Sequence, residues 1–390
     1  MQNEELFKSL SYTLPEGTRR EDLLLRAGSS SIEDIAKVPD ETTLGVRYDE
    51  KTKSFTNDDR LFVPPPSFVD VSPWAIASSR PPSSFFYRDA LQHRHAFSFS
   101  GNQDKFTARL RLEESELIVE NINEEQEVGN VIVKPWSGRY RFLPENEFFC
   151  MMLLSEMGFR VAESRLLQTN DGRFHFIVNR FDIERNPETG KNERIRTFQL
   201  AELMELPTDE NGKYSITTEE LMDFVDAHLV DFEKFVLSYI AGWAIGNGDM
   251  HAKNFSVYSD SDGRYHMTPL YDMLNTTVYE NMIDRLALPF GECCHPSPKG
   301  EDFLGFFAER YGEEFIKRCI TTLSRGSRKM NFLLEKMISL DSDNQRRTIF
   351  MEFLTQQTYR SIQDALRDAK QVLEQIQTRQ QNDAMIEFER

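Results

Sequence analysis

The hydrophobic pattern of this chain changes its period once, and that change restricts the folds that the chain can adopt. From His95 onward, apolar side chains recur every second residue in AFSFS, KFTARLRL, ELIVEN and NVIVKPW, which is the spacing of β-strands. Later the spacing becomes helical, and long amphipathic helices are predicted over about 300–378. A β-rich segment followed by a helical one predicts an α+β protein with a small antiparallel lobe and a larger helical lobe.

The elements between these two regions have recognisable ends. Pro144 suits the first helical position, and Gly158 suits the residue after the helix ENEFFCMMLLSEM. Strands are predicted at SRLLQT and FHFIVNRFD, followed by a charged, turn-rich stretch over 184–196. The Thr217-x-x-Glu220 capping box opens a helix, Asp231 is predicted to cap the next, and a hairpin is expected over about 255–272.

The first 90 residues differ from the rest. Residues 1–50 are predicted to form short helices, and the Pro- and Ser-rich residues 51–90 an extended connector. The organisation predicted for the chain is therefore an N-terminal part over 1–90, a β-rich lobe over 91–182 and a helical lobe over 183–390.

Charge and cysteine content limit the class of protein. With 390 residues and a net charge of −18, the chain is unsuited to non-specific binding of nucleic acids or anionic membranes. Its aromatic content of 12% is too high for a disordered protein. The four cysteines have no disulfide-framework spacing, and we find no signal peptide or apolar run of membrane-spanning length. These features predict a cytoplasmic protein with reduced thiols and no membrane contact.

The densest chemical signal is the sequence GNGDMHAKNF, which lies between a predicted helix and a predicted strand. Asp249 and Asn254 are five residues apart, and Asp272 follows the predicted hairpin. Phosphoryl transfer needs one carboxylate to accept the proton of the attacking hydroxyl, and amide and carboxylate oxygens to hold Mg²⁺ on the nucleotide. This spacing is that of a kinase catalytic loop. A turn aspartate is the alternative for Asp249 alone.

Two further residues match the same chemistry. Lys134 ends the apolar strand VIVK and can contact nucleotide phosphates, and Glu147 in the following helix is its natural partner. A solvated strand-edge lysine and a helix-capping glutamate are the alternatives. His251 has no HxxxH or HExxH partner, so a zinc site is disfavoured and a loop-ordering or nucleotide-contacting role is preferred. Two other segments, the strand–turn–strand over 98–105 and the strand end at 179–182, are by themselves only weak evidence for nucleotide binding.

In order along the chain, SFSGNQDK, VIVKP, LPENEFFCMMLLSEMG, VNRFD, FQLAELMEL, GNGDMHAKNFS and TPLYDML resemble the HipA/HipT kinases of bacterial toxin–antitoxin modules. The resemblance covers about residues 95–300. More weakly, SLSYTLPEGTRREDLLLRAG resembles the later part of that family's N-terminal subdomain, so residues 1–90 are expected to form a partial subdomain of this kind followed by the connector. Its usual opening strands are not recognised in the sequence, and the resemblance implies that a separate polypeptide would supply them, as in the three-gene HipBST arrangement.

The resemblance implies a Mg²⁺-ATP-dependent serine/threonine protein kinase with a bilobal, protein-kinase-like fold. Asp249 would be the catalytic base, and Asn254 and Asp272 would hold magnesium. Autophosphorylation on Ser98, Ser100 or both would eject the Gly-rich loop and switch the kinase off. The implied ATP-binding residues are Ser100, Gly101, Asn102, Gln103, Asp104, Lys105, Lys134, Glu147, Asn179, Arg180, Phe181, His251, Lys253 and Tyr271. Asn179 departs from the family, where a Glu is common.

The resemblance also implies partners. The protein substrate would be a translation component such as an aminoacyl-tRNA synthetase, and the regulatory partner a helix-turn-helix antitoxin, with a small N-terminal-subdomain protein beside it. DNA would be reached only through the antitoxin. Two alternatives stay open: a catalytically silent regulator or scaffold, and a lipid-directed or secreted effector kinase. Retention of Lys134, Glu147, Asp249, Asn254 and Asp272 argues against a silent member.

Overall fold

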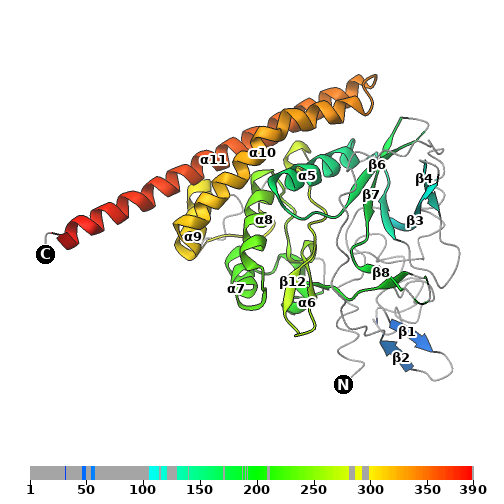
Figure 1. Ribbon diagram of the computed structural model, residues 1–390, viewed down its shortest axis with the longest axis horizontal. Coiled ribbons are helices and arrows are strands. Elements are labelled where there is room, and N and C mark those ends of the chain that lie inside the picture. The colour runs from blue at the N-terminus through cyan, green and yellow to red at the C-terminus, as the bar shows by residue number, and fades with distance from the viewer. Residues whose placement is uncertain are drawn as a thin grey trace. The chain divides into compact units, whose positions relative to one another are not determined.

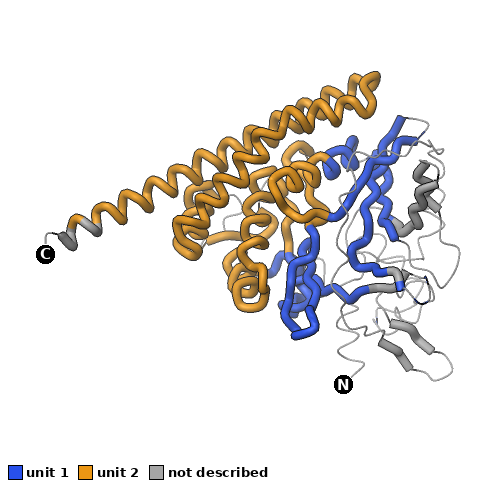
Figure 2. The backbone as a smooth tube through the Cα atoms, viewed as in Figure 1, with its two compact units in different colours: residues 1–148, 162–215, 252–269 blue, residues 149–161, 216–251, 270–390 orange. Residues whose placement is uncertain are grey.

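The computed structural model describes residues 31, 46–49, 54–57, 105–113, 116–120, 130–138, 140–169, 172–186, 188, 190, 192–208, 211–280, 286–291 and 298–388. It divides into two compact units, each made of separate chain segments (Figure 2). Unit 1 comprises 1–148, 162–215 and 252–269, and unit 2 comprises 149–161, 216–251 and 270–390. The predicted three-part division along the sequence stays a prediction.

Unit 1 contains a five-stranded antiparallel sheet in the order β4-β3-β5-β7-β6 (Figure 1). Its strands are β3 (Phe106–Glu113), β4 (Glu116–Glu120), β5 (Val131–Lys134), β6 (Ser164–Gln168) and β7 (Phe174–Asn179). Every neighbouring pair is antiparallel, with Lys134 opposite Phe176 in the β5–β7 pair. The antiparallel sheet predicted from the period of two is therefore confirmed. The AFSFS strand lies outside the described residues.

Smaller sheets complete unit 1. Strands β1 (Val46–Asp49) and β2 (Ser54–Asn57) form a hairpin where the sequence predicted short helices and a connector. Strands β8 (Ile183–Arg185) and β9 (Asn192–Arg194) pair inside the predicted turn-rich stretch. Strand β10 (Phe198–Gln199) joins β11 (Ser256–Ser259) and β12 (Tyr265–Met267), which confirms the predicted hairpin. Both missed hairpins are short, so neither extends far enough to show a clear period of two.

The short helices of unit 1 lie near that third sheet. They are α6 (Leu200–Leu203) and the 3₁₀ turns η1 (Gly212–Tyr214) and η2 (Ala252–Asn254). Elements α6, β10 and η1 all pack against η2, and the Leu200 N–H donates to the Phe255 carbonyl oxygen over 2.9 Å. The turn that carries Asn254 is therefore fixed by neighbours from an earlier part of the chain.

Helix α5 (Leu143–Met157) begins in unit 1 and continues in unit 2. It starts one residue before Pro144, and Gly158 follows it with a φ of 105°, as a helix-ending glycine should. Residues Leu143 to Leu154 are all buried, so the helix has no solvent-facing stripe. The almost continuous apolar run FFCMMLL accounts for this burial.

Unit 2 is helical. Its elements are α7 (Thr218–His228), α8 (Phe232–Ala244), the 3₁₀ turn η3 (Thr276–Val278), α9 (Gly300–Tyr311), α10 (Glu313–Ser339) and α11 (Gln345–Phe388). The capping box predicted at the start of α7 is present: the Thr217 hydroxyl accepts the Glu220 N–H, and the Glu220 carboxylate accepts the Thr217 N–H. Asp231 occupies the N-cap position of α8, but its side chain makes no capping hydrogen bond, so that part of the prediction is wrong.

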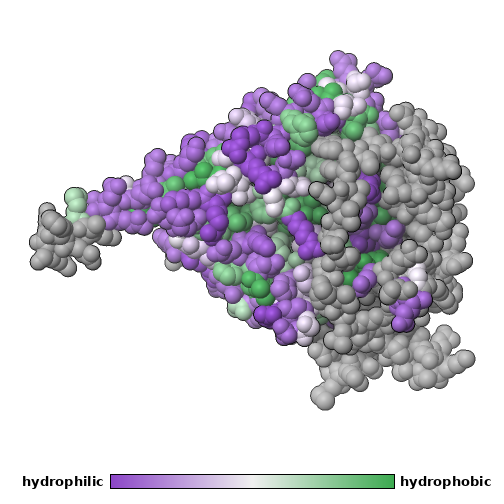
Figure 3. Space-filling model, viewed as in Figure 1, coloured by the Kyte–Doolittle hydropathy of each residue, from purple (hydrophilic) through white to green (hydrophobic). Residues whose placement is uncertain are grey.

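Helices α10 and α11 form a long hairpin that covers α8 and α9. Buried residues recur along both helices at helical spacing, as amphipathicity predicts. Figure 3 shows a mainly hydrophilic outer face with separate hydrophobic spots. Among the described residues of α10 and α11, the exposed large apolar residues are Phe332, Ile349, Phe353, Tyr359 and Met385. Scattered apolar residues of this kind are normal on a protein surface. None of the described helices is long and apolar enough to cross a membrane.

Candidate functional site

The residues predicted to bind ATP and magnesium are divided between the two units. Unit 1 holds Lys105, Lys134, Glu147, Asn179, Arg180, Phe181, Lys253 and Asn254, and unit 2 holds Asp249, His251, Tyr271 and Asp272. Ser98, Ser100, Gly101, Asn102, Gln103 and Asp104 lie outside the described residues.

In unit 1, Lys134 and Glu147 form a buried ion pair. Lys134 Nζ lies 2.5 Å from Glu147 Oε1, and their side chains are only 4% and 2% exposed. The ammonium also lies 5.5 Å from the centre of the Phe176 ring, opposite it in the sheet. Strand β5 and helix α5 thus bring together two residues that are thirteen positions apart. The predicted pairing is present, and the alternative of a solvated strand-edge lysine does not hold.

The segment that follows Lys134 is held by a histidine that sequence reasoning missed. His175 is fully buried on β7, and its Nδ1 accepts the Trp136 N–H over 3.1 Å. Trp136 stacks in turn against the Arg173 guanidinium, 4.2 Å from the ring centre. Because Nδ1 accepts a backbone donor, the proton of neutral His175 resides on Nε2, which faces the Thr169 hydroxyl. The chain beyond Lys134 is anchored to β7 by this contact.

At the end of β7, Asn179 is bound to a neighbour that the sequence did not reveal. Its N–H donates to the Glu163 carbonyl oxygen over 2.7 Å, and its Nδ2 donates to Glu163 Oε2 over 2.8 Å. The Arg180 N–H donates to the Asn130 carbonyl oxygen, and its guanidinium binds both carboxylate oxygens of Asp182. The strand end at 179–182 is therefore held by hydrogen bonds from several neighbours. That Asn179, Arg180 and Phe181 bind ATP stays a prediction.

Unit 2 presents Asp249 at the end of a tightly bonded loop. Asn247 Oδ1 accepts the Asp249 N–H over 3.0 Å, and Asp249 Oδ1 lies 3.5 Å from His251 Nε2. The Asp249 side chain is 42% exposed, whereas that of His251 is 5% exposed. A carboxylate in this setting can receive a proton from a group that approaches from outside. The imidazole of His251 is therefore buried beside this carboxylate, and the two roles preferred from the sequence, ordering the loop or contacting the nucleotide, stay predictions.

Two glycines allow the loop to adopt this shape. Gly246 has a φ of 87°, and a Cβ at this position would lie 2.8 Å from Asn275 Oδ1. At Gly242, on the preceding helix, a Cβ would overlap the sulfur atom of Met250. Any other residue at Gly246 would meet both backbone strain and a buried side chain.

Asp272 has an unusual backbone conformation. Its φ is 54°, in the left-handed region that aspartate tolerates better than most residues with a side chain. The bond from the Leu270 N–H to the Arg160 carbonyl oxygen, 2.9 Å long, fixes the segment just before it. Asp272 and Asn254 offer carboxylate and amide oxygens, the ligand types that Mg²⁺ accepts beside phosphate and water oxygens. Each residue is thus chemically suited to hold magnesium, and that the two hold it together stays a prediction.

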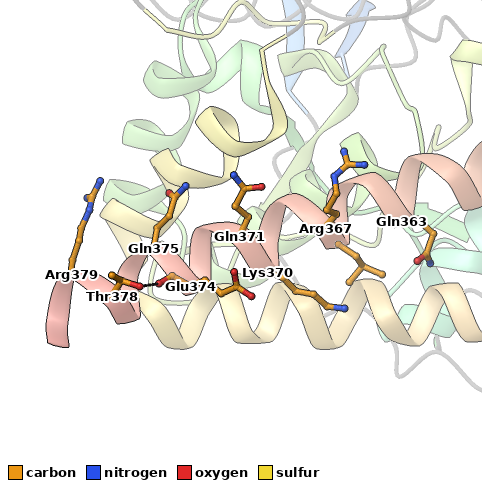
Figure 4. A pocket seen from close by; sticks show the side chains of 9 residues that line it. Gln363, Arg367, Lys370, Gln371, Glu374, Gln375, Thr378 and Arg379 are labelled. Carbon is orange, nitrogen blue, oxygen red and sulfur yellow. Dashed lines mark hydrogen bonds between the residues drawn. The ribbon is translucent and has the colours of Figure 1, made fainter. Parts of the chain in front are cut away.

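A polar hollow lies elsewhere, along α11. Figure 4 shows its side chains projecting from successive turns of this one helix. Its lining consists of Gln363, Leu366, Arg367, Lys370, Gln371, Glu374, Gln375, Thr378 and Arg379. It contains neither a predicted site residue nor an arrangement of groups suited to catalysis, so we assign it no role.

Known proteins share this chain's sequence and fold. The chain is 27% identical over 238 residues to a provisionally named kinase of Haemophilus influenzae, covering 58% of this chain and 67% of that protein. It is 30% identical over 200 residues to the provisionally named kinase Y4mE of Sinorhizobium fredii, covering 49% of this chain and 47% of that protein. The chain thus spans about half to two thirds of the length of these relatives.

A solved structure extends the likeness to the fold. The complex of Shewanella oneidensis HipA with HipB and its operator DNA contains a chain that matches with a TM-score of 0.68 at 19% identity, covering 95% of this chain and 87% of that one. The model of the HipA-like C-terminal domain family matches residues 97–383, which is most of the chain. The protein described here therefore belongs to the HipA-like C-terminal domain family.

Proposed function

We propose that this protein is a Mg²⁺-ATP-dependent serine/threonine protein kinase. The observation that carries the proposal is the loop over 246–254, which offers a partly exposed carboxylate at Asp249 and ends at Asn254, with Asp272 further along the chain. The HipA-like family and the provisional kinase names of relatives support it.

In the proposed reaction, Asp249 accepts the proton of a serine or threonine hydroxyl. The hydroxyl oxygen then forms a bond to the γ-phosphorus of ATP, the bond from that phosphorus to the β,γ-bridging oxygen breaks, and ADP leaves with those electrons. Magnesium held by Asn254 and Asp272 would neutralise charge on the phosphates. Lys134, fixed by Glu147, would contact the phosphates. His251 would hold the loop in shape.

We further propose that Ser98, Ser100 or both are autophosphorylated, and that Lys105 with residues 100–104 covers the nucleotide. Asn179, Arg180 and Phe181 would border adenine, with Lys253 and Tyr271 near the nucleotide. The cellular target would be a translation component such as an aminoacyl-tRNA synthetase. The HipA relative of known structure was solved with HipB and operator DNA. By analogy, a helix-turn-helix antitoxin would bind this chain in the cytoplasm and provide its link to DNA.

The test is labelling of the purified protein with Mg²⁺ and radioactive ATP. Asp249→Asn should lower the rate of phosphate transfer by about 10²–10⁴-fold, because the proton acceptor is lost. Asp262→Asn is the matched control, since that aspartate is 68% exposed in the β11–β12 turn and contacts Arg264. Its rate should equal that of the wild type.

Several outcomes would contradict the proposal. Wild-type labelling by Asp249→Asn would refute the assigned base. A wild-type protein that labels neither itself nor any protein, yet binds a helix-turn-helix partner, would be a scaffold. Transfer to lipid vesicles alone would identify a lipid kinase. Mass spectrometry should place phosphate on the SFSG segment. Phosphate found only elsewhere would refute autophosphorylation there.

A further inference from the structure

In unit 2, the loop before Asp249 is hydrogen-bonded to the residues that follow Asp272. The Thr276 hydroxyl accepts the Gly248 N–H over 2.8 Å and donates to the Gly246 carbonyl oxygen over 3.1 Å. The Thr276 N–H donates to that same oxygen over 2.9 Å. One threonine thus bonds to two positions of the loop. The backbone leading into Asp249 and the backbone leaving Asp272 are held at a fixed separation.

The residue before that threonine connects the same place to the C-terminal helix. Asn275 is fully buried, and its Nδ2 donates to the hydroxyl of Thr358 on α11 over 3.0 Å. Its Oδ1 accepts the Thr277 N–H and hydroxyl, at 2.9 and 2.7 Å. These bonds fix the orientation of the amide, since nitrogen must face Thr358 and oxygen must face Thr277. The amide is also the group that Gly246 approaches closely.

Helix α11 therefore contacts this turn through more than one residue. Besides Thr358, the ring of Phe350 stacks against Tyr279, 6.1 Å between centres, at the end of η3. The two contacts are eight residues apart on α11, about two helical turns. A partner at each of two turns restrains both the position and the tilt of η3 against the helix.

We propose that Asn275 and Thr358 are positioning residues, through which α11 sets the separation of Asp249 and Asp272. The inference rests on the proposed kinase function, in which one of these carboxylates accepts a proton and the other holds magnesium. A misplacement of about 1 Å can lower a reaction rate on the order of 10²-fold, so a support of this kind affects the rate without touching substrate. Residues after 345 thereby take part in catalysis.

The chain offers a matched pair of threonines for the test. Thr358 and Thr355 lie one turn apart on α11, and both are buried. Among the described residues, the Thr355 hydroxyl has no hydrogen-bond partner, whereas that of Thr358 accepts from Asn275. Replacing either by valine keeps the size of the side chain and removes the hydroxyl. Only Thr358→Val removes the bond to Asn275, and Thr358→Ser keeps it.

The rate of autophosphorylation and the Mg²⁺ concentration for half-maximal rate would be measured for each variant, together with the melting temperature. Thr358→Val should lower kcat and raise the Mg²⁺ requirement, each by roughly three- to tenfold, the range that one hydrogen bond can supply. Thr355→Val should stay within about twofold of the wild type, and Thr358→Ser should restore most of the loss. Equal kinetics for the two valine variants would overturn the proposal.

A second measurement keeps this inference separate from the proposed function. Amide hydrogen exchange at Gly248 and Thr276 reports the bonded turn directly and needs no kinase activity. Exchange should accelerate in Thr358→Val and not in Thr355→Val. If it does so in a protein that transfers no phosphate, the coupling stands and the kinase proposal fails. If exchange is unchanged, α11 does not hold the loop, whatever the activity.

Discussion

In unit 1, Lys134 and Glu147 are held by opposite charge inside a shell of apolar residues, whereas in unit 2 the loop around Asp249 is held by hydrogen bonds to backbone and by glycines. The charged pair resides on two regular elements, β5 and α5. The loop depends on a 3₁₀ turn and one helix further along the chain. Removing one partner of a buried ion pair lowers the stability of a protein by a large amount, whereas removing a single hydrogen bond from a loop lowers it by a small amount.

The largest effect should come from breaking the charged pair. Lys134→Met leaves a buried carboxylate without its ammonium partner, which should lower the free energy of unfolding by about 3–5 kcal/mol. The double variant Lys134→Met with Glu147→Met should lose much less, because neither charge of the pair is then left buried without the other. The free energy of unfolding in urea would be measured for Lys134→Met, for Glu147→Met and for the double variant. A double variant as unstable as the sum of the singles would show that the pair is not coupled.

A smaller effect is expected at the loop. Gly246→Ala forces alanine into the left-handed region, at a cost of about 1–2 kcal/mol, before any overlap with Asn275 is counted. Gly305→Ala is the control, since Gly305 lies within α9 with open space around it. That substitution should stabilise the protein by up to about 1 kcal/mol. If both alanine variants unfold at the same urea concentration, the loop does not need its glycine.

The smallest effect concerns an exposed hairpin turn. His266 donates to Asp260 over 2.9 Å, and the N–H groups of Arg264 and Asp262 donate to the same carboxylate, so its pKa falls to about 2. A depressed pKa contributes stability above the unfolded pKa of about 4. This contribution is lost as pH falls from about 4 to 2. Asp260→Asn should remove this part of the acid unfolding curve, which circular dichroism can follow. An unchanged curve would contradict it.

The sequence was informative where a short stretch decides the structure. The strand ending at Lys134, the helix that stops just before Gly158 and the capping box at Thr217 all depend on neighbours within a few residues, and all are present. The buried pairing of Lys134 with Glu147 was also predictable, because two charged residues beside apolar elements need each other.

The missed residues have partners far along the chain. Asn275 and Thr358 are 83 positions apart, and His175 is 39 positions from Trp136. Asparagine and threonine are common turn residues, and one histidine in a strand has no pattern of its own. Their roles follow from the tertiary structure alone. The Asp231 cap shows the same on a smaller scale, since the residue occupies the N-cap position without making the capping hydrogen bond.

The interleaving of the two units has a consequence for how the chain is made. The chain passes between the units after residues 148, 161, 215, 251 and 269. Unit 1 is therefore incomplete until residue 269 has left the ribosome, by which point only the first helices of unit 2 have emerged. No single cut releases either unit intact. Truncations that follow sequence order alone would divide both units, and a split protein would need its fragments to fold together.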